Sequence, residues 1–403
     1  MSSKAKLTRK VIDDYSRLRR DTEALIAPLS HEDMMLQSMA DVSPTKWHIG
    51  HVTWFFEAFF LDKVLDNYEW VDPRYKYLFN SYYESMGDRQ PRSQRGVLSR
   101  PSVDDIINYR KRVDAEVVRV LEGMSDAQVM QYMLVLETGI AHEEQHQELI
   151  LTDIKYNFSS HPFDQVYKAD FEDAEHTLDP PSNLYFDAGI YEVGADGSSF
   201  HYDNEGPMHR VYLNPWCLSS QLVTNGEYLE FVESGGYSRF EFWLSDGWNQ
   251  ISLTGSNLPL YWRKEGSDYF EYTLGGLKPL DKSAPVSHVN YYESQAYASF
   301  RKGRLPLEYE WEVAARQHRK RVGNFYGKVW QWTQSAYSPY PGFKPTMGSL
   351  GEYNSKFMCG QYVLKGSSRF TVKRHSRDSY RNFFTPKDQW QCSGIRLVFD
   401  ANI

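Results

Sequence analysis

Two histidines four residues apart are the part of this sequence with the clearest potential for chemistry. His142 and His146 lie in the run GIAHEEQHQELILTDIK, and side chains at that spacing share one face of a helix. A third histidine, His51, lies far upstream in SPTKWHIGHVTWFFEAFF. Three neutral imidazoles from two helices can bind one metal ion and leave coordination positions open, which is typical of catalytic rather than structural sites.

The segment that carries His51 also offers a competing ligand. His48 precedes His51 by about one helical turn, so the spacing alone leaves either residue as the third ligand. Glu144, Glu148 and Asp153 can each hold a ligand imidazole by its outer ring nitrogen. A plain salt bridge at the surface is an equally good interpretation of each carboxylate.

The first part of the chain predicts helices that position these histidines. Ser43-Pro44 is a good helix start, with a capping hydroxyl and a proline in the first helical position, and Ser102-Val-Asp-Asp105 resembles a capping box. Residues 70–101 predict a long irregular connection, which in a compact domain is usually functional. Apolar stripes and these signals predict four helices, over about 7–27, 43–65, 102–121 and 125–156. Such an arrangement predicts a four-helix bundle, whose core commonly holds metals.

The character of the sequence changes after about residue 160. Short apolar runs broken by Gly, Pro, Asn and Asp predict strands, and the stretches Thr224 to Ser234 and Glu308 to Arg316 predict helices. We therefore expect a helical bundle with the metal ligands over 1–165, a linker over 166–183, and an α+β substrate-binding domain over 184–403.

Composition narrows the class of protein. The net charge is −8 and no long basic patch occurs, so we expect no nucleic-acid partner. Three cysteines, Cys217, Cys359 and Cys392, are too few for a disulfide framework, and we expect all three to be small buried hydrophobes. No apolar run of about 18 residues and no signal peptide are visible, which predicts a cytoplasmic protein without a membrane partner.

Long motifs in both halves resemble one known family. SPTKWHIGHVTWFFE and HEEQHQELILTDIK resemble the DinB-like domain of the sulfoxide synthases of ergothioneine biosynthesis. The second half resembles the formylglycine-generating-enzyme fold, an irregular C-type-lectin-like module, through DNEGPMHRVYLNPW, VTNGEYLEFVESGGY, PVSHVNYYESQAYASF, GRLPLEYEWEVAAR, VWQWTQSAYSPYPGF and SYRNFFTPKDQWQCSGIRLVF. The resemblance covers nearly the whole chain. It implies an enzyme that uses non-haem iron(II) and dioxygen to join a cysteine-type thiol to the imidazole of hercynine, the Nα-trimethyl betaine of histidine, as a sulfoxide.

The resemblance also implies roles for residues of the first half. The family motif places the third ligand just before the TWFFE run, which makes His51, His142 and His146 the iron ligands and leaves His48 in the core or beside them. Gln145 is implied to reach the hercynine imidazole, directly or through water. The alternative for Gln145 is an exposed helix glutamine.

The stretch FNSYYESMGDRQPRSQRG resembles the branch that uses free cysteine in place of γ-glutamylcysteine. In that branch the pair Tyr82-Tyr83 stands beside the iron, and one phenol is implied to donate a proton to reduced oxygen. Arg89, Arg92 and Arg95 then form a cluster suited to the carboxylate of cysteine. Packed loop aromatics and a solvated basic loop are the structural alternatives.

Residues near the C-terminus are implied to bind hercynine. Aromatic faces suit a trimethylammonium group and amides suit a carboxylate, and the candidates are Asn382, Phe383, Phe384, Trp390 and Gln391. Core packing is the alternative for this set. Formylglycine-generating enzymes bind copper with a cysteine pair, whereas GSSRFTVKRHSRDSYR in the corresponding region contains no cysteine, so we do not expect that activity.

Three further functions stay open at the level of sequence. Selenoneine synthases are close relatives that join a selenosugar to hercynine, and SSRFTVKRHSRDSYRNFF departs from the usual synthase pattern, so the chalcogen donor is not fixed. A DinB-like metal-dependent thiol transferase would never activate oxygen. A lectin-like binding protein would hold only a structural zinc. The leading expectation is an iron(II)-dependent oxidoreductase acting on hercynine, cysteine and dioxygen.

Overall fold

The computed structural model describes residues 6–171, 182–319, 322, 324–348 and 354–400. The chain forms two compact units: Met1–Tyr167 with Thr346–Tyr353, and Lys168–Pro345 with Asn354–Ile403. Most of the predicted linker, residues 172–181, lies outside the described residues. None of the helices in the described part of the chain is long and apolar enough to cross a membrane.

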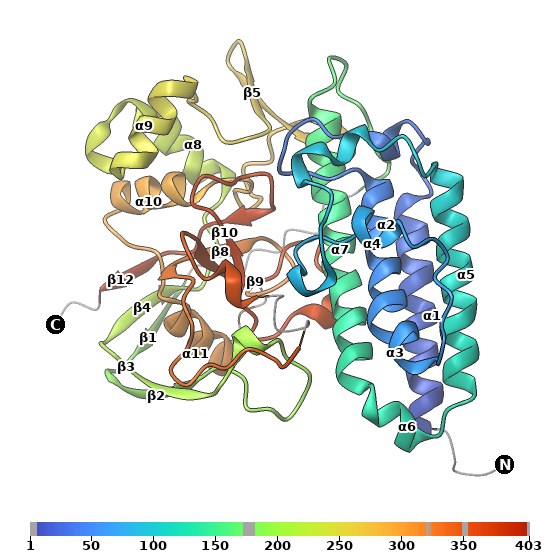
Figure 1. The fold of residues 1–403 in the computed structure, drawn as a ribbon. Coiled ribbons are helices and arrows are strands. Elements are labelled where there is room, and N and C mark those ends of the chain that lie inside the picture. Colours follow the sequence, from blue (N-terminus) through green and yellow to red (C-terminus); the bar gives the residue numbers. More distant parts are fainter. Residues whose placement is uncertain (1–5, 172–181, 320–321, 323, 349–353, 401–403) are drawn as a thin grey trace. The chain divides into compact units, whose positions relative to one another are not determined.

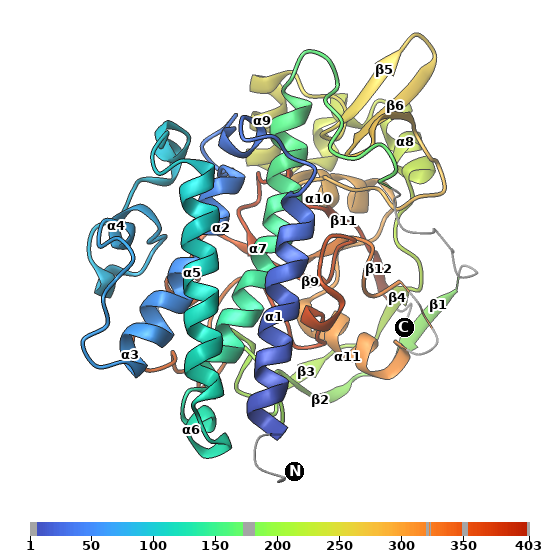
Figure 2. The same ribbon diagram turned by 90° about the vertical axis from the view of Figure 1, so that its right-hand side faces the viewer.

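Unit 1 is helical, as the sequence predicts. Its long helices α1, α2, α5 and α7 pack against one another, and Figure 2 shows α1, α5 and α7 side by side. The stripe predicted for the third helix is buried throughout, because Ile106, Tyr109, Val113, Val117 and Leu121 all face inward. The helices are α1 (Lys6–Ile26), α2 (Thr45–Phe56), α3 (Asp62–Val64), α4 (Tyr75–Leu78), α5 (Val103–Glu122), α6 (Asp126–Gln131) and α7 (Met133–Ser159).

Helix boundaries agree with the sequence signals at some ends and not at others. The Ser102 hydroxyl caps α5 in a full capping box with Asp105. The predicted fourth helix is broken at Tyr132, whose backbone (φ −104, ψ 6) separates α6 from α7. The predicted Ser43 cap is wrong, since α2 has Pro44 at its N-cap and no side-chain cap. Ser43 instead donates its backbone N–H to Asp153 at 2.8 Å.

A π-helical turn, Glu57–Leu61, follows α2 directly. Glu57 is fully buried and accepts hydrogen bonds from the phenols of Tyr68 at 3.0 Å and Tyr109 at 2.5 Å, and from the backbone N–H of Val71 at 2.9 Å. Turns of this kind are rare and often lie near functional sites. Here Glu57 ties the irregular connection after α3 to α5, so that segment is anchored to the bundle.

A buried ionic cluster joins the long helices at the level of the histidines. Glu143 on α7 accepts hydrogen bonds from Arg19 on α1 at 2.6 Å and from Arg110 on α5 at 2.6 Å. Arg19 also donates to the hydroxyl of Thr53 on α2 at 2.9 Å. Buried charges are tolerated when each one is paired and hydrogen-bonded. The cluster therefore fixes the rotation of α7 and α2 about their axes.

Unit 2 is an α+β module with short strands and long connections (Figure 1). Its strands form four small sheets, ordered β1-β4-β12, β10-β9-β8-β11, β2-β3 and β5-β6-β7. The strands are β1 (Asn183–Phe186), β2 (Gly189–Val193), β3 (His209–Leu213), β4 (Trp216–Ser219), β5 (Trp262–Glu265), β6 (Asp268–Thr273), β7 (Gly276–Pro279), β8 (Trp330–Ala336), β9 (Tyr362–Gly366), β10 (Asn382–Phe384), β11 (Ser393–Gly394) and β12 (Val398–Asp400). The helices are α8 (Asn225–Glu233), α9 (Ser245–Thr254), α10 (Tyr291–Phe300) and α11 (Glu308–His318).

The core of unit 2 is aromatic and polar at once. Phe186 stacks on Trp216 with ring centroids 4.4 Å apart, and the buried ammonium of Lys365 pairs with Glu312 at 3.0 Å.

The two predicted helices of this half correspond to α8 and α11. Cys217 and Cys392 are buried, but the prediction for Cys359 is wrong, because this residue is exposed next to the short 3₁₀ turn Ser355–Phe357.

Candidate metal centre

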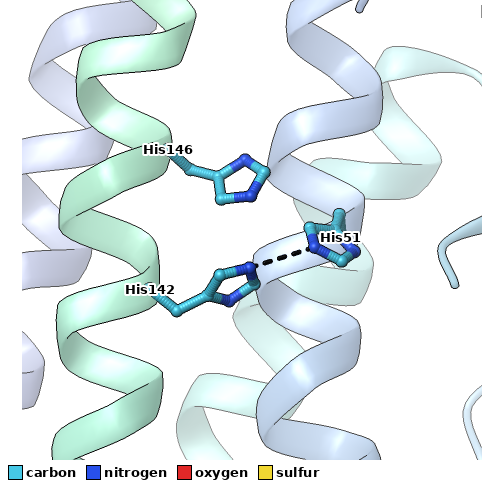
Figure 3. Close-up of side chains that lie close together, drawn as sticks. All are labelled: His51, His142 and His146. Carbon is cyan, nitrogen blue, oxygen red and sulfur yellow. Dashed lines mark hydrogen bonds between the residues drawn. The ribbon is translucent and has the colours of Figure 1, made fainter. Parts of the chain in front are cut away.

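Three buried imidazoles converge inside unit 1 (Figure 3). His51 comes from α2, and His142 and His146 come from successive turns of α7. One ring nitrogen of each lies within 4.8 Å of the corresponding nitrogens of the other two. The exposed fractions are 0%, 1% and 8%. The helical spacing and the convergence of two helices therefore place three nitrogen donors around one point.

The geometry of this group fits a metal ion. The Nε2 atoms of His51 and His142 lie 3.1 Å apart. Two nitrogen ligands bound at about 2.1 Å to one ion, at angles of about 90–110°, lie about 3.0–3.4 Å apart. Nδ1 of His51 donates to the carbonyl of Phe79 at 2.6 Å, which places the lone pair on Nε2, toward His142.

The surroundings also keep the imidazoles neutral. Burial lowers the pKa of His51 and of His146 well below the ordinary range, and the neighbouring His142 lowers both further. Burial lowers the pKa of His142 to about 3. Metals bind the neutral imidazole, so at neutral pH the group is in its ligand form.

Two glycines allow α2 and the segments around it to approach closely. A Cβ atom on Gly50 would lie 2.4 Å from the ring of Phe79, and a Cβ atom on Gly139 would lie 2.7 Å from the ring of Phe56. Both glycines lie within one turn of a candidate ligand. Close backbone approach is a common reason for glycine inside a helix. The two residues thus set the distance across which the histidines meet.

Aromatic and cationic side chains hold the His51 ring in place. The ring stacks against Trp47, at a centroid distance of 4.7 Å, and against Trp54, at 5.8 Å. The guanidinium of Arg95 lies over the ring of Trp47 at 3.3 Å from its centroid. Trp47 was not among the residues that sequence reasoning proposed for the site. Its signal is the spacing of four from His51, which puts both on one helix face.

The three predicted arginines have different environments. Arg89 is half-buried and pairs with Glu84, and Arg92 is exposed and donates to the carbonyl of Asp41. Arg95 is only 4% exposed and donates to the hydroxyls of Ser43 at 2.9 Å and Ser81 at 3.1 Å.

Within the described part of the chain, Arg95 forms no ion pair with a carboxylate, and its Nε atom has no hydrogen-bond partner. Burial, and then the charge of Arg92, lower the pKa of Arg95 to about 8. Arg95 is therefore a buried cation with unused capacity to bind an anion.

The tyrosine pair lies in a turn that is tied to the His51 helix. Tyr83 is fully buried, with ring centroids 5.8 Å from Trp54 and 4.9 Å from Phe59, and Tyr82 packs on Tyr83 at 4.7 Å. The turn is fixed by the buried Asn80, which accepts from the N–H of Tyr83 at 3.0 Å and donates to its carbonyl at 2.9 Å. The neighbouring Phe79 carbonyl binds His51, so the tyrosines and the ligand share one local framework.

Three further polar residues of α2 and α7 lie beside the ligands. His48 lies at hydrogen-bond distance from His146, with their Nδ1 atoms 2.8 Å apart, and its Nε2 atom is 3.0 Å from Asp153. His48 is thus adjacent to the ligand group without belonging to it. Asp153 is one of the three carboxylates considered as anchors of a ligand imidazole, and it reaches His146 through His48. Gln145 is half-buried, one residue before His146.

The candidates for hercynine binding lie in unit 2, on β10 and the segment after it. Phe383 stacks on Tyr337 with centroids 4.2 Å apart and planes at 10°, and Phe384 meets Trp390 edge to face at 5.7 Å. Asn382, Phe383 and Phe384 are all half-buried. Trp390 and Gln391 are buried, and the Gln391 amide donates to the carbonyl of Asp388 at 2.9 Å. The strand residues therefore present surface, whereas the other two pack behind them.

Comparisons with known proteins agree with this architecture. Residues 167–324 and 321–401 match the sulfatase-modifying factor enzyme 1-like domain, and residues 14–150 match the DinB superfamily. The chain belongs to the sulfatase-modifying factor enzyme 1-like family, with a DinB domain before the family domain. The predicted order of a DinB-like domain and a formylglycine-generating-enzyme-like domain is confirmed.

The similar proteins carry one recurrent name. The hercynine oxygenase of Mycolicibacterium thermoresistibile is 26% identical over 99% of this chain and 96% of its own length. That of Mycolicibacterium smegmatis is 25% identical over 98% of this chain and 100% of its own length. That of Mycobacterium tuberculosis is 29% identical over 65% of this chain and 70% of its own length. The resemblance to the hercynine-modifying family of ergothioneine biosynthesis is confirmed.

Proposed function

We propose that this protein is a non-haem iron(II)- and dioxygen-dependent sulfoxide synthase that joins the sulfur of cysteine to C2 of the hercynine imidazole in ergothioneine biosynthesis. The relatives named hercynine oxygenase support an oxygen-dependent reaction on hercynine. The observation that carries the proposal is the buried group of three histidines. The reaction balances without an external reductant, because one thiol, one imidazole C–H and one O₂ give the sulfoxide and water.

His51, His142 and His146 would hold the iron in this proposal. Iron(II), when bound, supplies dioxygen activation and favours the thiolate form of the sulfur substrate. Three neutral nitrogen donors leave positions for the substrates, as catalytic sites require. The two indoles that stack against His51 would keep that ring in its binding orientation.

Arg95 is the residue that we propose to bind the carboxylate of cysteine. A buried guanidinium without a carboxylate is costly in the free protein and gains a charge-assisted hydrogen bond when an anion arrives. The guanidinium lies over Trp47, which itself stacks against His51, and these two contacts support a role beside the proposed metal ligands. Arg89 and Arg92 are less buried than Arg95 and are already bonded, so they would contribute only to the long-range attraction of the substrate.

We propose that Tyr82 or Tyr83 donates the proton that reduced oxygen takes up. A phenol is protonated at neutral pH and transfers a proton over hydrogen-bond distance. The turn fixed by Asn80 presents both rings from the framework that holds His51. On the hercynine side, we propose Gln145 for the imidazole and Asn382, Phe383 and Phe384 for the betaine group. Trp390 and Gln391 would support that surface from behind.

The decisive experiment is product analysis with competing donors. Protein loaded with iron(II) under air, with hercynine and equal concentrations of cysteine and γ-glutamylcysteine, should give mainly the cysteine sulfoxide by mass spectrometry. One additional carboxylate without a paired cation costs a few kcal/mol, so we expect discrimination on the order of a hundredfold. Equal use of both thiols would refute the assignment of cysteine. Turnover only with a selenosugar would identify a selenoneine synthase, and product without oxygen consumption would identify a thiol transferase.

Metal binding is tested separately from turnover. His51→Ala, His142→Ala and His146→Ala should each lose tight iron binding in anaerobically purified protein, while circular dichroism shows an intact bundle. His31→Ala is the matched control, because His31 is exposed at the surface of the same unit. Stoichiometric iron in all three ligand variants would overturn the metal centre.

A further inference from the structure

A hydrogen-bonded chain runs from a buried carboxylate to one of the candidate metal ligands. Asp153 Oδ2 lies 3.0 Å from Nε2 of His48, and Nδ1 of His48 lies 2.8 Å from Nδ1 of His146. All three side chains are at most 8% exposed. The same Asp153 oxygen accepts the backbone N–H of Ser43 at 2.8 Å, which fixes the carboxylate from the other side.

The positions of the protons in these two hydrogen bonds follow from the contacts of His146. Because Nδ1 of His146 faces His48, only Nε2 of His146 is available to a metal. A neutral imidazole that binds metal through Nε2 carries its proton on Nδ1. His146 therefore donates to Nδ1 of His48. The proton of His48 must then lie on Nε2, from which it is donated to Asp153.

We infer that His48 and Asp153 are positioning residues for the metal centre: they fix the tautomer and orientation of His146 and place a negative charge two hydrogen bonds away from its metal-binding nitrogen. Carboxylates in this role make a ligand imidazole a better donor. Here the imidazole of His48 transmits the effect of the carboxylate, since Asp153 is hydrogen-bonded to His48 and not to the ligand His146. The inference rests on the proposed metal centre and adds to it two residues outside the ligand set.

His51 is fixed differently, and the carboxylate next to His142 in sequence is already paired. His51 donates from Nδ1 to the backbone carbonyl of Phe79, and Glu143 beside His142 is engaged by Arg19 and Arg110. Asp153 thus directs its charge to a ligand through side-chain hydrogen bonds. The donor strength of His146 should accordingly respond to a substitution outside the ligand set.

Three substitutions separate this role from packing. His48→Leu fills the space but removes both hydrogen bonds. His48→Gln keeps them, because its amide oxygen can accept from His146 while its amide nitrogen donates to Asp153. Asp153→Asn keeps the oxygen that accepts from His48 and removes only the charge. Ile154→Ala is the control for loss of stability, since Ile154 is a buried neighbour on the same helix that makes no polar contact.

The measurements are metal affinity, by competition of a chelator for cobalt(II) and iron(II), and the iron reduction potential. We expect His48→Leu to weaken metal binding about 10- to 100-fold and His48→Gln to restore most of the loss. Asp153→Asn should raise the potential, because the ferric ion loses the nearby negative charge. Ile154→Ala should lower the melting temperature without changing affinity.

The outcomes distinguish this inference from the metal centre on which it rests. Unchanged affinity in His48→Leu, an equal loss in His48→Gln, or an unchanged potential in Asp153→Asn would each overturn the positioning role while wild-type protein still binds metal. Wild-type protein that binds neither cobalt(II) nor iron(II) would instead overturn the metal centre itself. Asp153→Asn is nearly isosteric, so the test stands even where His48→Leu fails to fold.

Discussion

Glu293 in unit 2 should make the stability of the protein fall as pH rises from weakly acidic values to neutrality. This carboxylate is 1% exposed, and its hydrogen-bond partners in the described part of the chain are the phenol of Tyr237 at 2.6 Å and the backbone N–H of Asn290 at 2.8 Å. Neither partner is charged. Burial raises the pKa of Glu293 to about 7, from an ordinary value of 4.5, because hydrogen bonds alone do not replace the lost hydration of the anion.

The sign and size of the effect follow from linkage. A raised pKa means that the folded protein binds the proton more tightly, so stability falls between about pH 4.5 and pH 7 and is then constant. The full difference between the folded and unfolded pKa values corresponds to about 3 kcal/mol in the free energy of unfolding. About 2 to 3 kcal/mol of this stability is lost between about pH 5 and pH 8. Glu293→Gln keeps an oxygen that can accept from Asn290 but cannot ionise. The free energy of unfolding of the variant, taken relative to wild type, should therefore be about 2 to 3 kcal/mol higher at about pH 8 than at about pH 5.

The assay is denaturant unfolding of both proteins at the two pH values, followed by tryptophan fluorescence. Glu227→Gln is the matched control: Glu227 holds the same capping position in α8 as Glu293 holds in α10, but its side chain is 42% exposed. Its substitution should change stability by the same amount at both pH values. A Glu293→Gln variant whose stability relative to wild type does not depend on pH would refute the reasoning.

Three further predictions concern the candidate site. The double variant Tyr82→Phe, Tyr83→Phe should keep iron and substrate binding but lose most sulfoxide formation, with sulfinic acid as a side product; a wild-type rate and product ratio by mass spectrometry would show that the rings only pack. Arg95→Met should raise the KM for cysteine about 10- to 100-fold without loss of stability, whereas Arg89→Met should not, and equal KM values for both variants would contradict the carboxylate role. Gly139→Ala should destabilise unit 1 by about 1 to 3 kcal/mol and weaken metal binding, because the new methyl group meets the aromatic rings of α2. Helix propensity alone predicts the opposite, a rise of about 1 kcal/mol in the free energy of unfolding. Such a rise would show that the helices can move apart without cost.

Local patterns in the sequence were enough to predict the elements that carry the chemistry. The period of the helix places His142 and His146 on one face before any partner is known. The capping box at Ser102 and the buried stripe of α5 are likewise local, because they depend on residues three or four apart. Motif resemblance predicted the two domains and their order, and the family comparisons confirm that prediction.

Other features depend on contacts between residues far apart in the chain. His48 and His51 lie on one helix within a turn of each other, and only the packing of α2 against α7 decides that His51 meets His142 while His48 bridges His146 and Asp153. The Ser43 cap failed for the same reason, since its backbone N–H goes to Asp153 on another helix.

Three arginines that look alike in sequence are separated by burial in the structure. Arg95 enters the core above Trp47, whereas Arg89 and Arg92 stay at the surface. Cys359 is exposed despite its apolar character, because it follows a short surface turn. Helical periodicity is a property of one segment, but the burial and hydrogen-bond partners of a side chain are set by whichever segments pack against it, and a single sequence does not record that pairing.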